Sequence, residues 1–131
     1  MKKHFYPVIF QPEDVGFSAI VPDIPGCMTQ GDTMEETLDM LQEAMGLMLD
    51  GVQENNYPKS SLPQDISTDG TQFVMMVPFD KVAYDKKYNS KSVKKTLSIP
   101  CWLDSMAKEK NINFSNLLQN ALCKELNVSF N

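Results

Sequence analysis

The amino-acid sequence predicts an α+β fold divided into two domains. In residues 1–80 the apolar patterning indicates strand, strand, short strand, helix and strand, the order of one helix packed across a small sheet. Residues 93–131 instead indicate one short strand followed by two short helices. The charge divides as well: residues 1–80 hold 3 lysines and 13 acids, a net −10, and residues 81–131 hold 9 lysines and 4 acids, a net +5. We therefore expect an acidic domain over 1–80, a basic linker over 81–92 and a second domain over 93–131.

The first domain is expected to open with a β-hairpin. Residues 5–10 are rich in aromatic and branched side chains, and Pro7 among them favours an edge strand or a bulge. Residues 13–16 form a polar turn, and residues 17–21 alternate as a returning strand does. A stiff proline-rich loop and a short third strand over residues 27–30 follow.

A capped helix comes next in the sequence. Thr33 is suited to the N-cap, and Glu36 three residues later completes a capping-box pattern. Apolar residues then recur at spacings of four and three: Met34, Leu38, Leu41, Met45, Met48 and Val52. We interpret the methionines as core residues, with an adaptable binding groove as the alternative. Residues 72–77 predict a fourth strand, apolar enough to be covered on both faces or central in the sheet.

The second domain is expected to be too small to fold alone. Residues 93–99 alternate between apolar and polar, Pro100 ends this strand, and Asn111 and Asn113 suit the end of one helix and the cap of the next. Each helix has an apolar stripe: Leu103, Met106 and Ala107 on the first, and Leu117, Leu118, Ala121, Leu122 and Leu126 on the second. A segment of this length cannot bury such stripes by itself. Two copies that pair their strands would form a ribbon on four helices, a two-fold symmetric dimer.

This segment resembles the ribbon-helix-helix family of DNA-binding proteins. Two strings carry the resemblance: Lys94-Lys95-Thr96-Leu97-Ser98-Ile99-Pro100 and Ile112-Asn113-Phe114-Ser115-Asn116-Leu117-Leu118. The resemblance implies a ribbon in the major groove of DNA, whose outward side chains read base edges: Lys94, Thr96 and Ser98. Further residues would hold backbone phosphates: Lys91, Lys95, Asn113, Phe114 and Ser115. The alternative is a module that only dimerises.

Residues 17–33 resemble the signature of HicB-type antitoxins. The string is Phe17-Ser18-Ala19-Ile20-Val21-Pro22-Asp23-Ile24-Pro25-Gly26-Cys27-Met28-Thr29-Gln30-Gly31-Asp32-Thr33, followed by Glu35-Glu36-Thr37-Leu38 at the start of a helix. The resemblance implies a partial ribonuclease H-like fold of β-β-β-α-β order. It also implies neutralisation of a HicA-type toxin, a small, basic, RNA-cleaving protein, and repression of the antitoxin's own operon.

Charge supports the same partner. A domain with a net charge of −10 repels nucleic acid and attracts a basic protein through long-range steering. A protein that covers an RNA-binding surface is expected to present acidic side chains to it. The candidates for contact with the toxin are Glu13, Asp14, Asp23, Asp32, Glu35, Asp39 and Glu43.

Enzymatic functions find little support in the residues. His4 is the only histidine, and the 3 cysteines (Cys27, Cys101 and Cys123) form no C-x-x-C motif, which disfavours zinc sites and a disulfide scaffold. Glu43 and Asp50 lie two helical turns apart without an acid on the first strand, so a two-metal nuclease is disfavoured. We expect no catalytic residue, metal or cofactor. The sequence has no membrane-spanning run and no secretory signal pattern, so a cytoplasmic protein is expected.

The sequence thus predicts an antitoxin that neutralises a HicA-like toxin and acts as a transcription repressor. The expected partners are the toxin, operator DNA and a second copy of the chain, with a higher hetero-oligomer as a further alternative. The competing hypothesis is a stand-alone DNA-binding regulator whose N-terminal domain senses a ligand or oligomerises. A metal-dependent nuclease ranks third.

Overall fold

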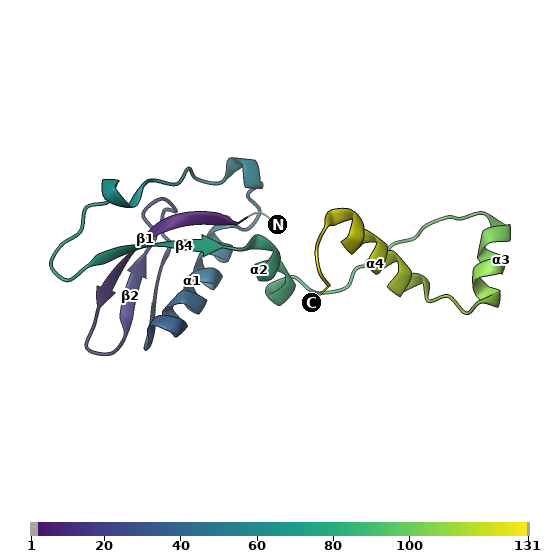
Figure 1. Cartoon of the computed structure of the whole chain (residues 1–131), viewed down its shortest axis with the longest axis horizontal. Helices are drawn as coiled ribbons and strands as arrows, with labels where there is room; N and C mark the ends of the chain where they lie inside the picture. The colour runs from purple at the N-terminus through teal and green to yellow at the C-terminus, as the bar shows by residue number, and fades with distance from the viewer. Residues whose placement is uncertain (1–2, 131) are drawn as a thin grey trace. The chain divides into compact units, whose positions relative to one another are not determined.

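The computed structural model describes residues 3–130, which divide into two compact units with the boundary between Ser90 and Lys91 (Figure 1). We call residues 3–90 the acidic unit and residues 91–130 the C-terminal unit. Residues 81–90, which were expected to form part of a linker, belong to the acidic unit. No helix in residues 3–130 is long and apolar enough to cross a bilayer.

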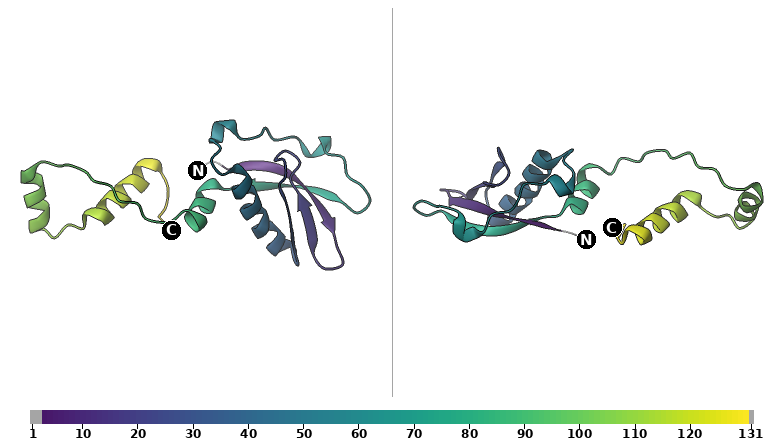
Figure 2. Two further views of the ribbon diagram at one scale, coloured as in Figure 1. Left: turned by 180° about the vertical axis from the view of Figure 1, so that it is seen from behind. Right: turned by 90° about the horizontal axis from the view of Figure 1, so that it is seen from above.

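The acidic unit is built on a four-stranded antiparallel sheet with the strand order β3-β2-β1-β4 (Figures 1 and 2). The strands are β1 (His4–Pro12), β2 (Phe17–Ile20), β3 (Met28–Gly31) and β4 (Phe73–Phe79). All four predicted strands of this domain are therefore present, and β1 and β2 form the expected hairpin, with Ile9 opposite Ile20 and Pro12 opposite Phe17.

Two predictions about strand position were wrong. The strand containing Pro7 is not an edge strand, because β1 lies between β2 and β4. Strand β2 pairs only with residues 9–12 of β1, so Pro7 has no neighbouring strand on the β2 side. Proline is tolerated in this interior strand because no backbone N–H is needed there for pairing with β2. Conversely, β4 is not central but lies at the edge of the sheet, and Met76 on it is 39% exposed.

The outer edge of β4 is protected at one end. The Gln42 side chain donates to the Pro78 carbonyl oxygen at 2.7 Å and accepts from the Asp80 N–H at 3.4 Å. Pro78 itself has no N–H to offer to another strand. Side-chain amides and prolines of this kind block the pairing of an edge strand with a further chain.

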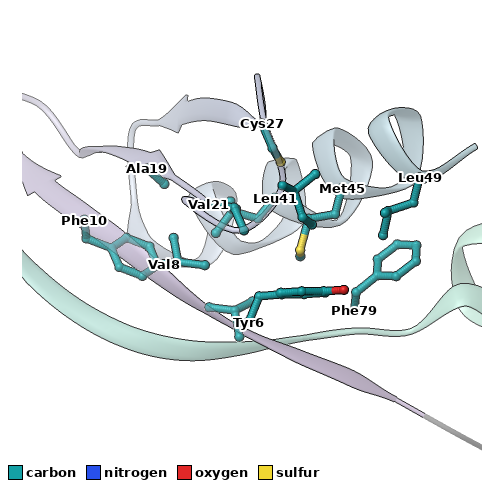
Figure 3. Packing of buried hydrophobic residues seen from close by; sticks show 12 residues of the cluster. Tyr6, Val8, Phe10, Ala19, Val21, Cys27, Leu41, Met45, Leu49 and Phe79 are labelled. Carbon is teal, nitrogen blue, oxygen red and sulfur yellow. The ribbon is translucent and has the colours of Figure 1, made fainter. Parts of the chain in front are cut away.

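Helix α1 (Met34–Leu49) crosses one face of the sheet and closes the core (Figure 3). The buried side chains come from α1, from the strands and from the loop before β3: Tyr6, Val8, Phe10, Ala19, Val21, Ile24, Cys27, Leu41, Met45, Leu49, Val77 and Phe79. Of the predicted apolar stripe, Leu41 and Met45 are buried, whereas Met48 is 45% exposed and Val52 lies beyond the helix. Leu49, one residue later than Met48, fills the last core position.

The predicted N-cap of α1 at Thr33 is confirmed, whereas the Glu36 side chain reaches back to residue 32 and not to the N-cap as in a capping box. The Thr33 hydroxyl accepts a hydrogen bond from the Glu36 N–H at 3.0 Å, and the Glu36 carboxylate accepts one from the Asp32 N–H at 3.3 Å. We expect Thr33→Ala to lower the free energy of unfolding by about 1 kcal/mol, because it leaves one first-turn N–H without a partner. Urea denaturation followed by far-ultraviolet circular dichroism measures this, and Thr33→Ser is the control that keeps the cap.

Two 3₁₀ turns (Glu54–Asn56 and Pro63–Asp65) lie in the loop between α1 and β4, and helix α2 (Lys81–Tyr88) follows β4. Tyr84 of α2 packs against Phe79 and occupies the space beside Gly46 of α1, where a Cβ atom would lie 2.0 Å from the tyrosine ring. Gly46 therefore provides the recess in which α2 docks. The sequence patterns did not predict this helix.

The C-terminal unit contains helices α3 (Cys101–Glu109) and α4 (Phe114–Leu126), which confirms both predicted helices. Asn111 has the left-handed conformation expected after the first of them, with φ of 55°. The predicted strand over residues 93–99 is absent: residues 91–100 are exposed and form neither strand nor helix. A strand requires a neighbouring strand, and the sequence prediction had placed that neighbour in a second copy of the chain.

Candidate functional site

Glu13, Asp14 and Asp32 lie at one end of the sheet, whereas Asp23 lies in the loop between β2 and β3 at the other end. The turn that contains Glu13 and Asp14 packs against the end of β3, since a Cβ on Gly16 would lie 1.9 Å from the Gly31 carbonyl oxygen and 2.6 Å from the Asp32 Cα. This close approach, with φ of +75° at Gly16, places the turn beside Asp32. The fold therefore brings together acids that are far apart in the sequence.

Along α1 the acids form a row. Glu35, Asp39 and Glu43 follow one another at intervals of four residues and so share one side of the helix. Glu35 and Asp39 are exposed and Glu43 is half-buried. None of the three makes an ion pair within the described part of the chain, so their charge is available to a partner.

Two of the predicted toxin-binding residues have roles inside the fold. The Asp23 carboxylate accepts hydrogen bonds from the Ser61 N–H at 2.8 Å and from the Ser61 hydroxyl at 2.7 Å, which ties the loop before β3 to the loop after α1. The Glu13 carboxylate accepts from the Ser18 hydroxyl at 2.9 Å across the hairpin. Asp23 is half-buried by this contact, which makes it the weakest of the seven as a recognition residue.

The DNA-binding candidates lie in the C-terminal unit. Lys94, Thr96 and Ser98 are exposed, as are Lys91 and Lys95. At the start of α4, the Asn113 side chain accepts from the Asn116 N–H at 3.0 Å, so the predicted cap is confirmed. Phe114 and Ser115 are the first two residues of α4. The first-turn N–H groups that do not bond to the Asn113 side chain point out of the start of the helix, and such groups favour the binding of an anion.

The basic run that the sequence showed between residues 81 and 95 is divided between the two units. Lys81, Lys86 and Lys87 lie on α2 within the acidic unit. Lys81 donates to the Asp85 carboxylate at 2.6 Å, and this hydrogen bond raises the pKa of Lys81. Burial raises the pKa of Asp85, but hydrogen bonds from Lys81 and Asn89 outweigh it and leave that pKa below its ordinary value. Only Lys91, Lys94 and Lys95 of the run belong to the C-terminal unit.

The C-terminal unit has no hydrophobic core of its own. No residue between 91 and 130 is buried. Its exposed side chains include Leu97, Ile99, Trp102, Met106, Leu117 and Leu122, each 47–67% exposed. The predicted apolar stripes of α3 and α4 are therefore present but uncovered.

Within residues 3–130, no three carboxylate, imidazole or thiol groups converge as a metal would require. The imidazole of His4 hydrogen-bonds to the Glu54 carboxylate at 3.0 Å. Burial raises the pKa of the Cys27 thiol to about 11, so this thiol stays protonated at neutral pH and is a poor nucleophile.

Comparison with known proteins identifies the family. A family model described as the HicB-like antitoxin of bacterial toxin–antitoxin systems matches residues 6–122. The chain belongs to this HicB-like antitoxin family. The strand-loop-helix string over residues 17–38, which resembles the HicB-type signature, lies within the matched range.

Two individual relatives are similar over about half of this chain. Antitoxin HicB 2 of Photorhabdus laumondii is 39% identical over 69 residues, which cover 53% of this chain and 47% of that protein. The UPF0150 protein ssl0259 of Synechocystis is 38% identical over 63 residues, which cover 47% of this chain and 86% of that protein. The chain thus spans about half the length of the Photorhabdus antitoxin.

A solved structure agrees over nearly the full length. The structure described as "Toxin-Antitoxin complex from Streptococcus pneumoniae" contains a chain with 26% sequence identity and a TM-score of 0.56, and the match covers 95% of this chain and 99% of that one. The mixed α+β fold, with its antiparallel sheet and four helices in the described residues, is therefore shared with a chain of that complex.

Proposed function

We propose that this protein neutralises a HicA-like, RNA-cleaving toxin by covering the toxin with its acidic unit. The observation that carries the proposal is the row of acidic side chains on α1, which form no ion pair in the described chain. Membership of the HicB-like family supports it. The similar chain from Streptococcus pneumoniae comes from a toxin–antitoxin complex, which supports a toxin as the partner here.

The mechanism is steric and electrostatic, and we propose that it involves no catalysis by this chain. The acidic unit would approach a basic toxin faster than a neutral protein does, because opposite charges steer the encounter. Once bound, it would occupy the surface to which the toxin's RNA substrate binds. In the cytoplasm, where we place the protein, such a complex would keep messenger RNA intact.

Co-expression tests this function. The full chain and the small protein encoded beside its gene are produced together, with an affinity tag on one of them. We expect the two to co-purify and the antitoxin to restore growth that the toxin alone arrests. Failure of both readouts with a folded antitoxin would remove the proposed function.

We further propose that the C-terminal unit dimerises and binds operator DNA as a ribbon-helix-helix domain. Residues 93–99 would pair with the same residues of a second copy, and the apolar side chains of α3 and α4 would pack around the ribbon. The absence of any buried residue between 91 and 130 supports this, since a 40-residue segment with uncovered leucines gains little stability alone.

Trp102, the only tryptophan, reports on this association because it lies in the C-terminal unit and is 64% exposed. We expect its fluorescence to shift to shorter wavelength as protein concentration rises from nanomolar to micromolar, in parallel with a monomer-to-dimer transition in sedimentation. Leu122→Asp places a charge on the apolar side of α4 and should abolish both changes. A concentration-independent spectrum from a monomer would contradict the proposal.

A further inference from the structure

The outer side of α1 carries a second apolar stripe that the core does not use. Met40, Leu47 and Met48 are 37%, 63% and 45% exposed. Met40 and Leu47 are seven residues apart and so share one side of the helix. Met48 lies about a quarter of a turn away from both, and its methyl group lies beside Gly26 in the loop before β3. The core is filled by a different side of the same helix, through Leu41, Met45 and Leu49. The fold of the acidic unit therefore leaves the outer stripe without a role.

An acidic row borders this stripe. Glu43 lies within about one helical turn of both Met40 and Leu47, and Glu35 and Asp39 continue the row toward the start of the helix. Helix α1 contains 4 acids and no lysine. Glu35 lies in the first turn, where a carboxylate interacts favourably with the helix dipole. Asp39 and Glu43 lie beyond that turn, and like charges four residues apart destabilise a helix by roughly 0.2–0.5 kcal/mol per pair. Such a conflict is expected where a surface serves binding.

The combination of charges and apolar side chains selects the partner. Nucleic acid is repelled by the row. A second copy that docked α1 against α1 would place carboxylates opposite carboxylates, with no cation on either helix to separate them. A protein whose apolar contact surface is surrounded by lysine or arginine complements both the apolar side chains and the acidic row. Methionine side chains adapt to the shape of such a contact.

We propose that this surface of α1, made by Met40, Leu47, Glu35, Asp39 and Glu43, is the principal contact with the toxin. The proposal rests on the function proposed above and specifies the site. Met40 and Leu47 form the desolvated centre of the interface, and Asp39 and Glu43 pair with cations at its rim. The apolar centre sets the lifetime of the complex, and the rim sets its rate of formation.

The apolar centre is tested with the double variant Met40→Ser, Leu47→Ser in the full chain. Its binding to the purified protein encoded beside the gene is measured by surface plasmon resonance. We expect the dissociation rate constant to rise by about tenfold or more, with the association rate constant changed less than about twofold. The matched control is Leu62→Ser, a leucine 55% exposed in the loop after α1, which should behave as the unchanged chain.

The acidic rim is tested with Asp39→Asn, Glu43→Gln, which keeps the shapes of both side chains. We expect the association rate constant at low ionic strength to fall by about tenfold and to lose much of its salt dependence. Asp65→Asn, at an exposed position in the second 3₁₀ turn, is the control for the loss of charge alone. Circular dichroism melting curves confirm that each variant is folded.

The outcomes separate the two proposals. If the unchanged chain binds the neighbouring protein and both double variants bind as well as it does, the α1 surface is not the contact, although the antitoxin function stands. If only the Leu62 or Asp65 control weakens binding, the contact lies on the loop face instead. If the unchanged chain does not bind at all, the proposed function and this site fail together.

Discussion

Leu41→Ala is expected to lower the free energy of unfolding of the acidic unit by about 2–5 kcal/mol. Leu41 is fully buried at the centre of α1, in the cluster that contains Val8, Phe10 and Met45 (Figure 3). Truncation removes apolar contacts and leaves a cavity that the surrounding strands cannot close. Because small domains have only about 5–15 kcal/mol of stability, this loss is a large fraction of the total.

Leu47→Ala provides the matched control, since it is the same substitution in the same helix at a position that is 63% exposed. Its free energy of unfolding should change by less than about 0.5 kcal/mol. Urea titrations followed by circular dichroism compare the two variants. Equal losses of stability would show that the core does not lie where the structure places it.

Lys94→Ala is expected to weaken binding of the operator by about thirtyfold or more and to leave toxin binding unchanged. In a dimer each half-site loses one contact to a base edge, and such contacts contribute about 1–3 kcal/mol each. Affinity for unrelated DNA should fall much less, so the ratio of specific to non-specific binding decreases. Electrophoretic mobility shifts with the DNA upstream of the gene, at a fixed salt concentration, measure both quantities.

Two lysines serve as controls for this prediction. Lys91→Ala removes a proposed phosphate contact, so it should weaken specific and unrelated DNA alike and reduce the slope of log affinity against log salt. Lys87→Ala changes a lysine on α2, within the acidic unit, and should change neither affinity more than about twofold. If Lys94→Ala abolishes toxin binding while the protein remains folded, the proposed separation of the two activities is wrong.

Local signals predicted much of the acidic unit. The Thr33 and Glu36 pair fixes the start of α1 through hydrogen bonds that span only four residues, and the hairpin depends on a turn and two adjacent alternating segments. These features do not require knowledge of the rest of the chain. The acidic row on α1 was equally visible, because residues four apart on a helix must share a side.

Features that depend on distant contacts were missed. Met48 and Leu49 lie three and four residues after Met45, so the helical spacing allows either of them to enter the core. Only the packing of α1 on the sheet determines that Leu49 is the buried one. Helix α2 carries lysines that indicate a linker, and its docking depends on Gly46, 38 positions before Tyr84, having no side chain. A signal for this helix did exist, because Asp80 suits an N-cap, and its side chain accepts from the Ala83 N–H at 3.1 Å.

The strand over residues 93–99 shows a different limit of sequence reasoning. The alternation of apolar and polar residues suits a strand whose neighbour belongs to a second copy of the chain. The structure of a single chain therefore does not contain this strand. The assignment of Lys94, Thr96 and Ser98 to DNA therefore stays a prediction.

The C-terminal unit's lack of buried residues makes the two proposed activities respond differently to dilution. The acidic unit has its own core and stays folded at any protein concentration. The concentration of a weak dimer, in contrast, falls with the square of the monomer concentration. As a growing cell halves its stock of this protein, gene silencing would lapse first. Fresh transcripts of the operon would then appear while each remaining molecule still restrained the nuclease.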